Sequence, residues 1–188
     1  MDLFEFVTGM ISVTLALAAA QLFLGIAQLV QTPAKVRVSL THGAWVAVLF
    51  LITFLHWWSL WDFRDLSWSF PMFGFSLVGP GLMFFAVVLI NPREASGSSV
   101  DLYAHFHRIR KPFLIVFFVM MLFMTLDGPV FGTEPALNRL RLGQAGMMTL
   151  AALGVGAKSR RVQSVISILA LAAASVAVTA RFIPGVVS

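Results

Sequence analysis

The sequence predicts an all-α membrane protein, a bundle of six transmembrane helices that forms a single domain over residues 1–188. Six apolar stretches are each long enough to cross a hydrocarbon core, which takes about 20 helical residues. Hydrophobic residues make up 59% of the chain and charged residues only 11%, whereas a soluble domain carries about a quarter charged residues. The stretches also lack the alternation typical of barrel strands. The expected spans are 6–30, 41–61, 68–90, 112–131, 137–157 and 162–182.

Composition narrows the function classes. The chain has no cysteine, which excludes disulfide exchange, iron–sulfur clusters and thiolate metal sites. Its pI is near 10.8, but the basic residues flank the apolar spans rather than forming one patch, so we expect no nucleic-acid binding. No Gly-x-Ser-x-Gly, His-Glu-x-x-His or phosphate-loop motif occurs. A non-enzyme is therefore favoured, and an enzyme stays open.

Lysine and arginine predict the orientation. Of the 13 basic residues, nine fall in the three loops that follow the first, third and fifth spans. By the positive-inside rule these loops are cytoplasmic. Both termini then lie outside, in the periplasm if the membrane is a bacterial inner membrane. The nine residues are Lys35, Arg37, Arg93, Arg108, Arg110, Lys111, Lys158, Arg160 and Arg161.

The first span carries small and polar residues on two faces, including Glu5 near its start and Gln21 near its middle. Small residues let helices approach closely, so we expect this helix to be central and packed on both flanks. Gln21 needs a polar partner at that depth. An interhelical hydrogen bond and a role in permeation or ligand binding are both open.

The second span places His42 and His56 on one stripe, fourteen residues apart, or about 21 Å along a helix. That spacing suits a bundle with two stacked haems, but no other span contains a histidine, so this interpretation fails. No cofactor is predicted. A single haem with another second ligand stays open, and otherwise His56 is a packed or hydrogen-bonded histidine near the interface.

The third span contains Gly79-Pro80-Gly81 close to its centre. Proline lacks the amide donor and disturbs the carbonyl four residues earlier, that of Ser76. Broken helices at mid-membrane present backbone groups to an ion or substrate in transporters. We therefore expect a break here that is a permeation or ligand site, with a simple kink as the alternative.

Between spans three and four, residues 94–100 read as a flexible loop and residues 101–111 as a short interfacial amphipathic helix. Two interpretations of the helix are open, a metal site and a solvated basic helix at the headgroups. The metal site would use Asp101, His105 and His107, with His42 from the same side of the membrane.

The fourth span is expected to start at Pro112 and to stop at Asp127-Gly128-Pro129. Asp127 either pairs with an arginine near the outer surface or belongs to an acidic vestibule or proton-titrating site, since ionisable residues at membrane depth are functional candidates. Spans five and six are rich in small residues, which predicts tight packing or an oligomer face. These are Gly143, Gly146, Ala152, Gly156, Ala170, Ala174 and Ala177.

Three passages together resemble a group of small multi-pass bacterial inner-membrane proteins of unassigned function. They are Asp2-Leu3-Phe4-Glu5-Phe6, His56-Trp57-Trp58-Ser59-Leu60-Trp61 and Asp101-Leu102-Tyr103-Ala104-His105-Phe106. The resemblance implies a bacterial inner membrane and implies no particular chemistry.

The function that the sequence favours is passage of an ion or small solute, through one bundle or a homo-oligomer in the lipid bilayer. A channel is favoured over a pump because the chain is short. One alternative is a sensor or assembly partner that binds another membrane protein. A second alternative is a redox protein linked to haem or quinone.

Overall fold

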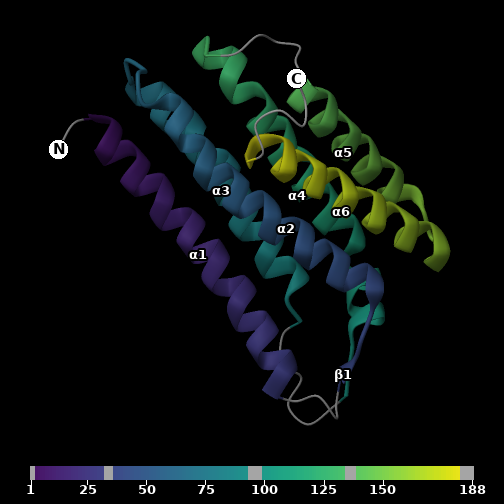
Figure 1. The fold of residues 1–188 in the computed structure, drawn as a ribbon. Coiled ribbons are helices and arrows are strands. Elements are labelled where there is room, and N and C mark those ends of the chain that lie inside the picture. The colour runs from purple at the N-terminus through teal and green to yellow at the C-terminus, as the bar shows by residue number, and fades with distance from the viewer. Residues whose placement is uncertain (1–2, 32–35, 93–98, 134–138, 183–188) are drawn as a thin grey trace.

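In the part of the chain that the structure describes, six helices form the bundle, and one short strand pair links the segment between the first two helices to the segment between the third and the fourth (Figure 1). The computed structural model describes residues 3–31, 36–92, 99–133 and 139–182. The strands β1 (Val36–Arg37) and β2 (Val100–Asp101) pair in parallel. The helices are α1 (Leu3–Gln31), α2 (Leu40–Ser59) with a 3-10 extension η2 (Leu60–Phe63), α3 (Phe70–Ile90), α4 (Leu102–Phe131), α5 (Arg139–Gly156) and α6 (Arg160–Phe182).

Five of the described helices are long and apolar enough to cross a membrane: α1, α2 with η2, α3, α4 and α6. This confirms the predicted all-helical architecture of the described residues and supports the prediction of a membrane protein. The fifth expected span corresponds to α5, which has 18 residues and is not among the five. Its arginines and Gln144 lower its mean hydropathy.

The helices close into a ring, in which α1 also packs on α3 and α2 on α6 although these helices are not consecutive in the sequence. α3 packs between α1 and α4, α4 packs on α5, and α6 packs against both α5 and α2. Figure 1 shows α1 at one edge of the bundle and α5 and α6 at the opposite edge. The pairing of α2 with α6 brings the second span against the last one.

The expectation that α1 is central is wrong. α1 buries a single stripe and exposes its other faces, with Leu17 and Leu24 each 54% exposed. The stripe follows helical spacing and combines large and small side chains, so the small residues on the opposite face of α1 are not part of a second packed face. The buried stripe is Val7, Ile11, Leu15, Ala18, Ala19, Leu22 and Gly25.

The expected interfacial helix is not a separate element, because α4 runs without interruption from Leu102 to Phe131. Asp101 caps its start by accepting hydrogen bonds from the backbone N–H groups of Tyr103 and Ala104, both at 2.9 Å. Its 30 residues span about 45 Å, so the first turns extend beyond a hydrocarbon core of about 30 Å. The loop expected at residues 94–100 lies outside the described residues up to position 98.

Proline does not end these helices. Pro112 and Pro129 both lie inside α4, which ends at Gly132 instead, a residue in the left-handed conformation with φ 70°. α3 likewise continues through Gly79-Pro80-Gly81, so the expected break in the third span is not observed.

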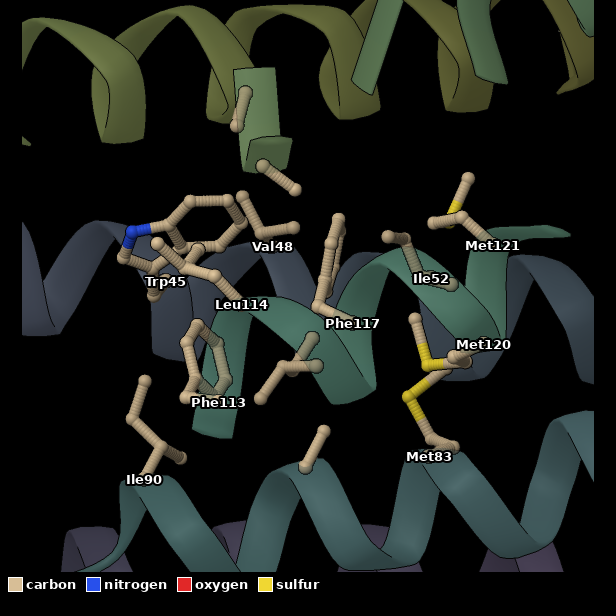
Figure 2. Close-up of a cluster of buried hydrophobic side chains, with 14 of the residues drawn as sticks. Trp45, Val48, Ile52, Met83, Ile90, Phe113, Leu114, Phe117, Met120 and Met121 are labelled. Atoms are coloured by element: carbon tan, nitrogen blue, oxygen red, sulfur yellow. The ribbon is translucent and has the colours of Figure 1, made fainter. Parts of the chain in front are cut away.

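A dry layer of aromatic and methionine side chains fills the middle of the bundle. Trp45 of α2 meets Phe113 and Phe117 of α4 edge-on, with ring centroids 5.4 and 5.0 Å apart. Met83 of α3 and Met120 of α4 complete the layer, and all five side chains have no exposed surface. Figure 2 shows these side chains from three helices pointing toward one another.

Candidate functional site

A cavity of about 110 Å³ lies between α2, α4, α5 and α6, at the end of the bundle opposite the strand pair. We call it the main cavity because of its charged lining; a wider surface groove of about 480 Å³ lies beside Phe4, Thr8 and Trp57. Isoleucine, leucine, methionine and alanine side chains form most of its wall, as in many small-molecule sites. Its polar and charged lining residues are His56, Ser59, Asp62, Asp127, Arg141, Gln144 and Arg181.

A second cavity of about 20 Å³, the small cavity, adjoins the main cavity. His56, Met124 and Asp127 line both. Ser76 and Pro80 of α3 line the small cavity only. A cavity needs roughly 10–15 Å³ of this kind of volume to hold one water, so the small cavity has room for a single water molecule.

The small cavity therefore brings together candidate residues from three predicted spans. They are His56 of the second, Ser76 and Pro80 of the third and Asp127 of the fourth. The hydroxyl of Ser76 donates to the carbonyl of Phe73 at 2.9 Å, which leaves its oxygen lone pairs able to accept. Because Pro80 has no N–H, the carbonyl of Ser76 lacks its helical donor four residues on. The helix is unbroken, yet its missing hydrogen bond falls beside a cavity.

Charged side chains surround the main cavity. Arg181 of α6 forms an ion pair with Asp62 of η2, and both side chains are about one-third exposed, so this pair lies at the cavity mouth. Arg141 is only 5% exposed. One carboxylate oxygen of Asp127 accepts from the backbone N–H of Gly128 at 2.6 Å.

Two polar side chains of the cavity wall have atoms that make no hydrogen bond to a described residue. The side-chain oxygen of Gln144 is buried without a hydrogen-bond partner among the described residues, while its amide nitrogen donates to the carbonyl of Met124 at 3.5 Å. The ring of His56 forms no hydrogen bond to a described residue. Its backbone carbonyl accepts from the hydroxyl of Ser59 at 2.7 Å.

The opposite end of the bundle holds a histidine pair. His42 and His105 each direct Nε2 at the carbonyl oxygen of Ile90, at 2.9 and 3.1 Å. A carbonyl only accepts, so both Nε2 atoms carry a proton, an assignment inferred from the bonding pattern. Arg108 lies 3.4 Å from Nδ1 of His105, the nitrogen left to accept.

The structure does not assemble the metal site considered from the sequence. No three histidine, aspartate or glutamate side chains of the described segments are grouped so as to hold a metal ion. His107 is two residues from His105 on one helix and so points away, where it stacks on Tyr103. Asp101 caps α4 and lies 3.6 Å from Arg37 in an ion pair.

Asp101 lies outside the spans and titrates in an electropositive setting. Hydrogen bonds from the backbone N–H groups of Ala104 and Tyr103, with the positive charges of Arg37 and Arg160, lower the pKa of its carboxyl group below the usual value of 3.8. Each of these interactions favours the ionised form. The carboxylate thus holds the start of α4 at neutral pH.

The remaining predicted residues lie outside both cavities. Glu5 is exposed in the first turn of α1. The backbone carbonyl of Gln21, rather than its side chain, accepts a hydrogen bond from Asn91 at 2.7 Å. Gly81 is half-buried on α3, one residue beyond the small cavity.

Four residues that line the main cavity were not among the site candidates from the sequence: Asp62, Arg141, Gln144 and Arg181. Arg141 and Gln144 lie three residues apart on α5 and therefore on one face, which was a readable signal. The pairing of Asp62 with Arg181 joins residues 119 positions apart, and no local pattern could have revealed it.

Comparison with protein-family models, with curated proteins and with solved structures found no match to this chain. The resemblance to small bacterial inner-membrane proteins stays a prediction.

Proposed function

We propose that this protein passes an ion or small solute across a membrane and that the main cavity is the binding site. The observation that carries the proposal is the convergence of His56, Asp127, Ser76 and Pro80 on two adjoining cavities. These residues come from three helices and were each candidates on separate grounds. Polar groups gathered within an apolar bundle are where transporters bind their substrates.

The dry layer makes a carrier a better proposal than an open channel. The main cavity is reached at the end where Asp62 and Arg181 lie, and toward the other end stand Trp45, Phe113 and Phe117 without exposed surface. A solute in the cavity would thus be accessible from one side. Passage would require the layer to part, as in a protein whose site faces the two sides in turn.

We place this protein in a bacterial inner membrane with the basic end in the cytoplasm. The strand pair joins two basic loops, and the Arg160 guanidinium lies over the Tyr103 ring at 4.3 Å, so all three basic loops gather at one end. The exposed tryptophans Trp57, Trp58 and Trp61 lie at the other. The positive-inside rule then makes the cavity face the outside.

Two of the small residues of α6, Ala170 and Ala174, give no support to an assembly partner. Ala170 and Ala174 have 0% and 2% exposure, so they serve packing within this chain and are not available to another protein or to a second copy.

A cavity-filling variant tests the proposal. Ala174 lines the main cavity, and Ala174→Leu should reduce uptake of a panel of labelled ions and metabolites by the full chain in liposomes. Ala172→Leu is the matched control, because Ala172 is exposed on another face of the same helix. Equal uptake by both variants and the unmodified chain, or no uptake of any compound by the unmodified chain, would refute the proposal.

A further inference from the structure

His56 and Asp127 are the two ionisable side chains that line both cavities among the residues described. One comes from α2 and the other from α4, so the boundary between the cavities has an ionisable group on either side. Both side chains are half-buried. Water that enters the main cavity therefore reaches the imidazole ring and the carboxyl group.

The small cavity supplies a place for water between these groups and α3. It has room for one water molecule, and the hydroxyl and carbonyl oxygens of Ser76 are the acceptors that Pro80 and the local hydrogen bonding leave open. A buried water needs two to four polar partners. His56, Asp127 and Ser76 provide that number on one cavity wall.

The other charged groups around the main cavity are Asp62 of η2, Arg141 of α5 and Arg181 of α6. Asp62 and Arg181 neutralise each other. Arg141 adds a positive charge to the wall of the main cavity. The charge of the cavity then depends on how many protons His56 and Asp127 hold.

We propose that His56 and Asp127 form a coupled proton-binding site and that the proton is the ion which this bundle passes or exchanges. The inference rests on the proposed function and names its substrate. A proton from cavity water binds a ring nitrogen of His56 or a carboxylate oxygen of Asp127 and is returned to water, with no change of electrons. Such histidine and carboxylate pairs serve as proton relays within membranes.

Infrared difference spectroscopy on the full chain in lipid nanodiscs tests the site. As the pH is lowered, a protonated carboxyl band should appear, and it should be lost in Asp127→Asn. In His56→Gln the pH midpoint of the band should shift by about one pH unit or more, the usual effect of removing a neighbouring charge. Asp65→Asn is the control, because Asp65 is 84% exposed and lines neither cavity, and it should change nothing.

The unmodified protein gives a second measurement that does not depend on the folding of a variant. With labelled histidine, the magnetic resonance signal of the His56 ring should follow the same two titration steps as the carboxyl band, because coupled groups share macroscopic steps. A band that survives in Asp127→Asn, or independent titration of the two groups, would refute the proton site.

A flux assay separates this inference from the proposed function. Liposomes that contain the full chain and a pH-sensitive dye should take up protons under an inward potential, and Asp127→Asn should abolish the uptake. Solute uptake that Ala174→Leu reduces, without coupled titration, refutes the proton site alone. Coupled titration without any flux refutes passage and leaves the site.

Discussion

At the scale of single residues, Gly25 of α1 lies where the side chain of Asn91 crosses from the end of α3. A Cβ atom at Gly25 would lie 2.3 Å from the Asn91 side-chain oxygen, far inside van der Waals contact. The same Asn91 side chain donates to the carbonyl of Gln21. The glycine thus permits the hydrogen bond that joins the two helices.

Gly25→Ala should lower the thermal unfolding temperature, because Asn91 must move and its bond to Gln21 is lost, at a cost of about 1–3 kcal/mol. Gly9→Ala on the same helix is the control. Nothing lies within 4 Å of its added carbon, and alanine favours a helix over glycine by about 1 kcal/mol. Melting curves in one detergent decide, and equal stability of the two variants would contradict the close contact.

The carboxylate of Asp101 predicts an acid sensitivity. Its pKa is lowered in the folded protein, so its stabilising effect is complete above the usual value of 3.8 and is lost as the pH falls through the lower folded value. Thermal melts at successively lower pH should show this loss. Asp101→Asn should flatten the dependence in that window, and an unchanged slope would show that other groups cause the loss.

The sequence identified individual site residues more successfully than it identified their neighbours in the fold. Asp127 stood out because ionisable groups are costly at membrane depth, and His56 because it shares a stripe with His42. Both residues line the cavities. Arg141, which lines the main cavity with them, was covered only by the expectation that Asp127 pairs with an arginine near the outer surface. Gln21 was chosen for its side chain, but its backbone makes the contact.

At the scale of elements, the prolines show where simple rules fail. Each proline removes one helical hydrogen bond, and three were expected to start, break or stop a helix. α3 and α4 continue through Pro80, Pro112 and Pro129. In an apolar medium an unpaired backbone costs so much that the helix persists and neighbouring groups or water satisfy the freed carbonyl.

Pro80→Ala tests what that missing bond does in α3. Alanine would restore a donor to the Ser76 carbonyl, so thermal stability should hold or rise. If the carbonyl serves the small cavity, solute or proton uptake should fall at the same time. Measuring both on one variant separates a site from a packed kink, and unchanged uptake in a stable protein would remove α3 from the site.

At the scale of the whole molecule, hydropathy predicted the helical bundle and the ends of most spans within a few residues. The length and hydropathy of a segment show where a span lies. They do not show which helices pack against each other, because lipid accommodates any apolar face equally well. For that reason α1 was placed at the centre although it packs at an edge, and the contact of α2 with α6 was not foreseen.

The proposed orientation rests on the gathering of basic loops at one end. A reporter that is active only in the periplasm should work when fused at Ser188 and should fail when inserted near Gly97, because the two positions are expected on opposite sides. A cytoplasmic reporter at the same positions is the control and should give the reverse. Activity near Gly97 alone would invert the topology.

The strand pair at the basic end also has a mechanical consequence. β1 enters α2 and β2 enters α4, and close by, the rings of His42 and His105 both hold the Ile90 carbonyl. These contacts hold together the ends of α2, α3 and α4 that lie near the strand pair. At the opposite end the main cavity lies between α2 and α4. We expect α2 and α4 to move relative to each other with the end near the strand pair as the hinge and with the largest displacements at the cavity mouth.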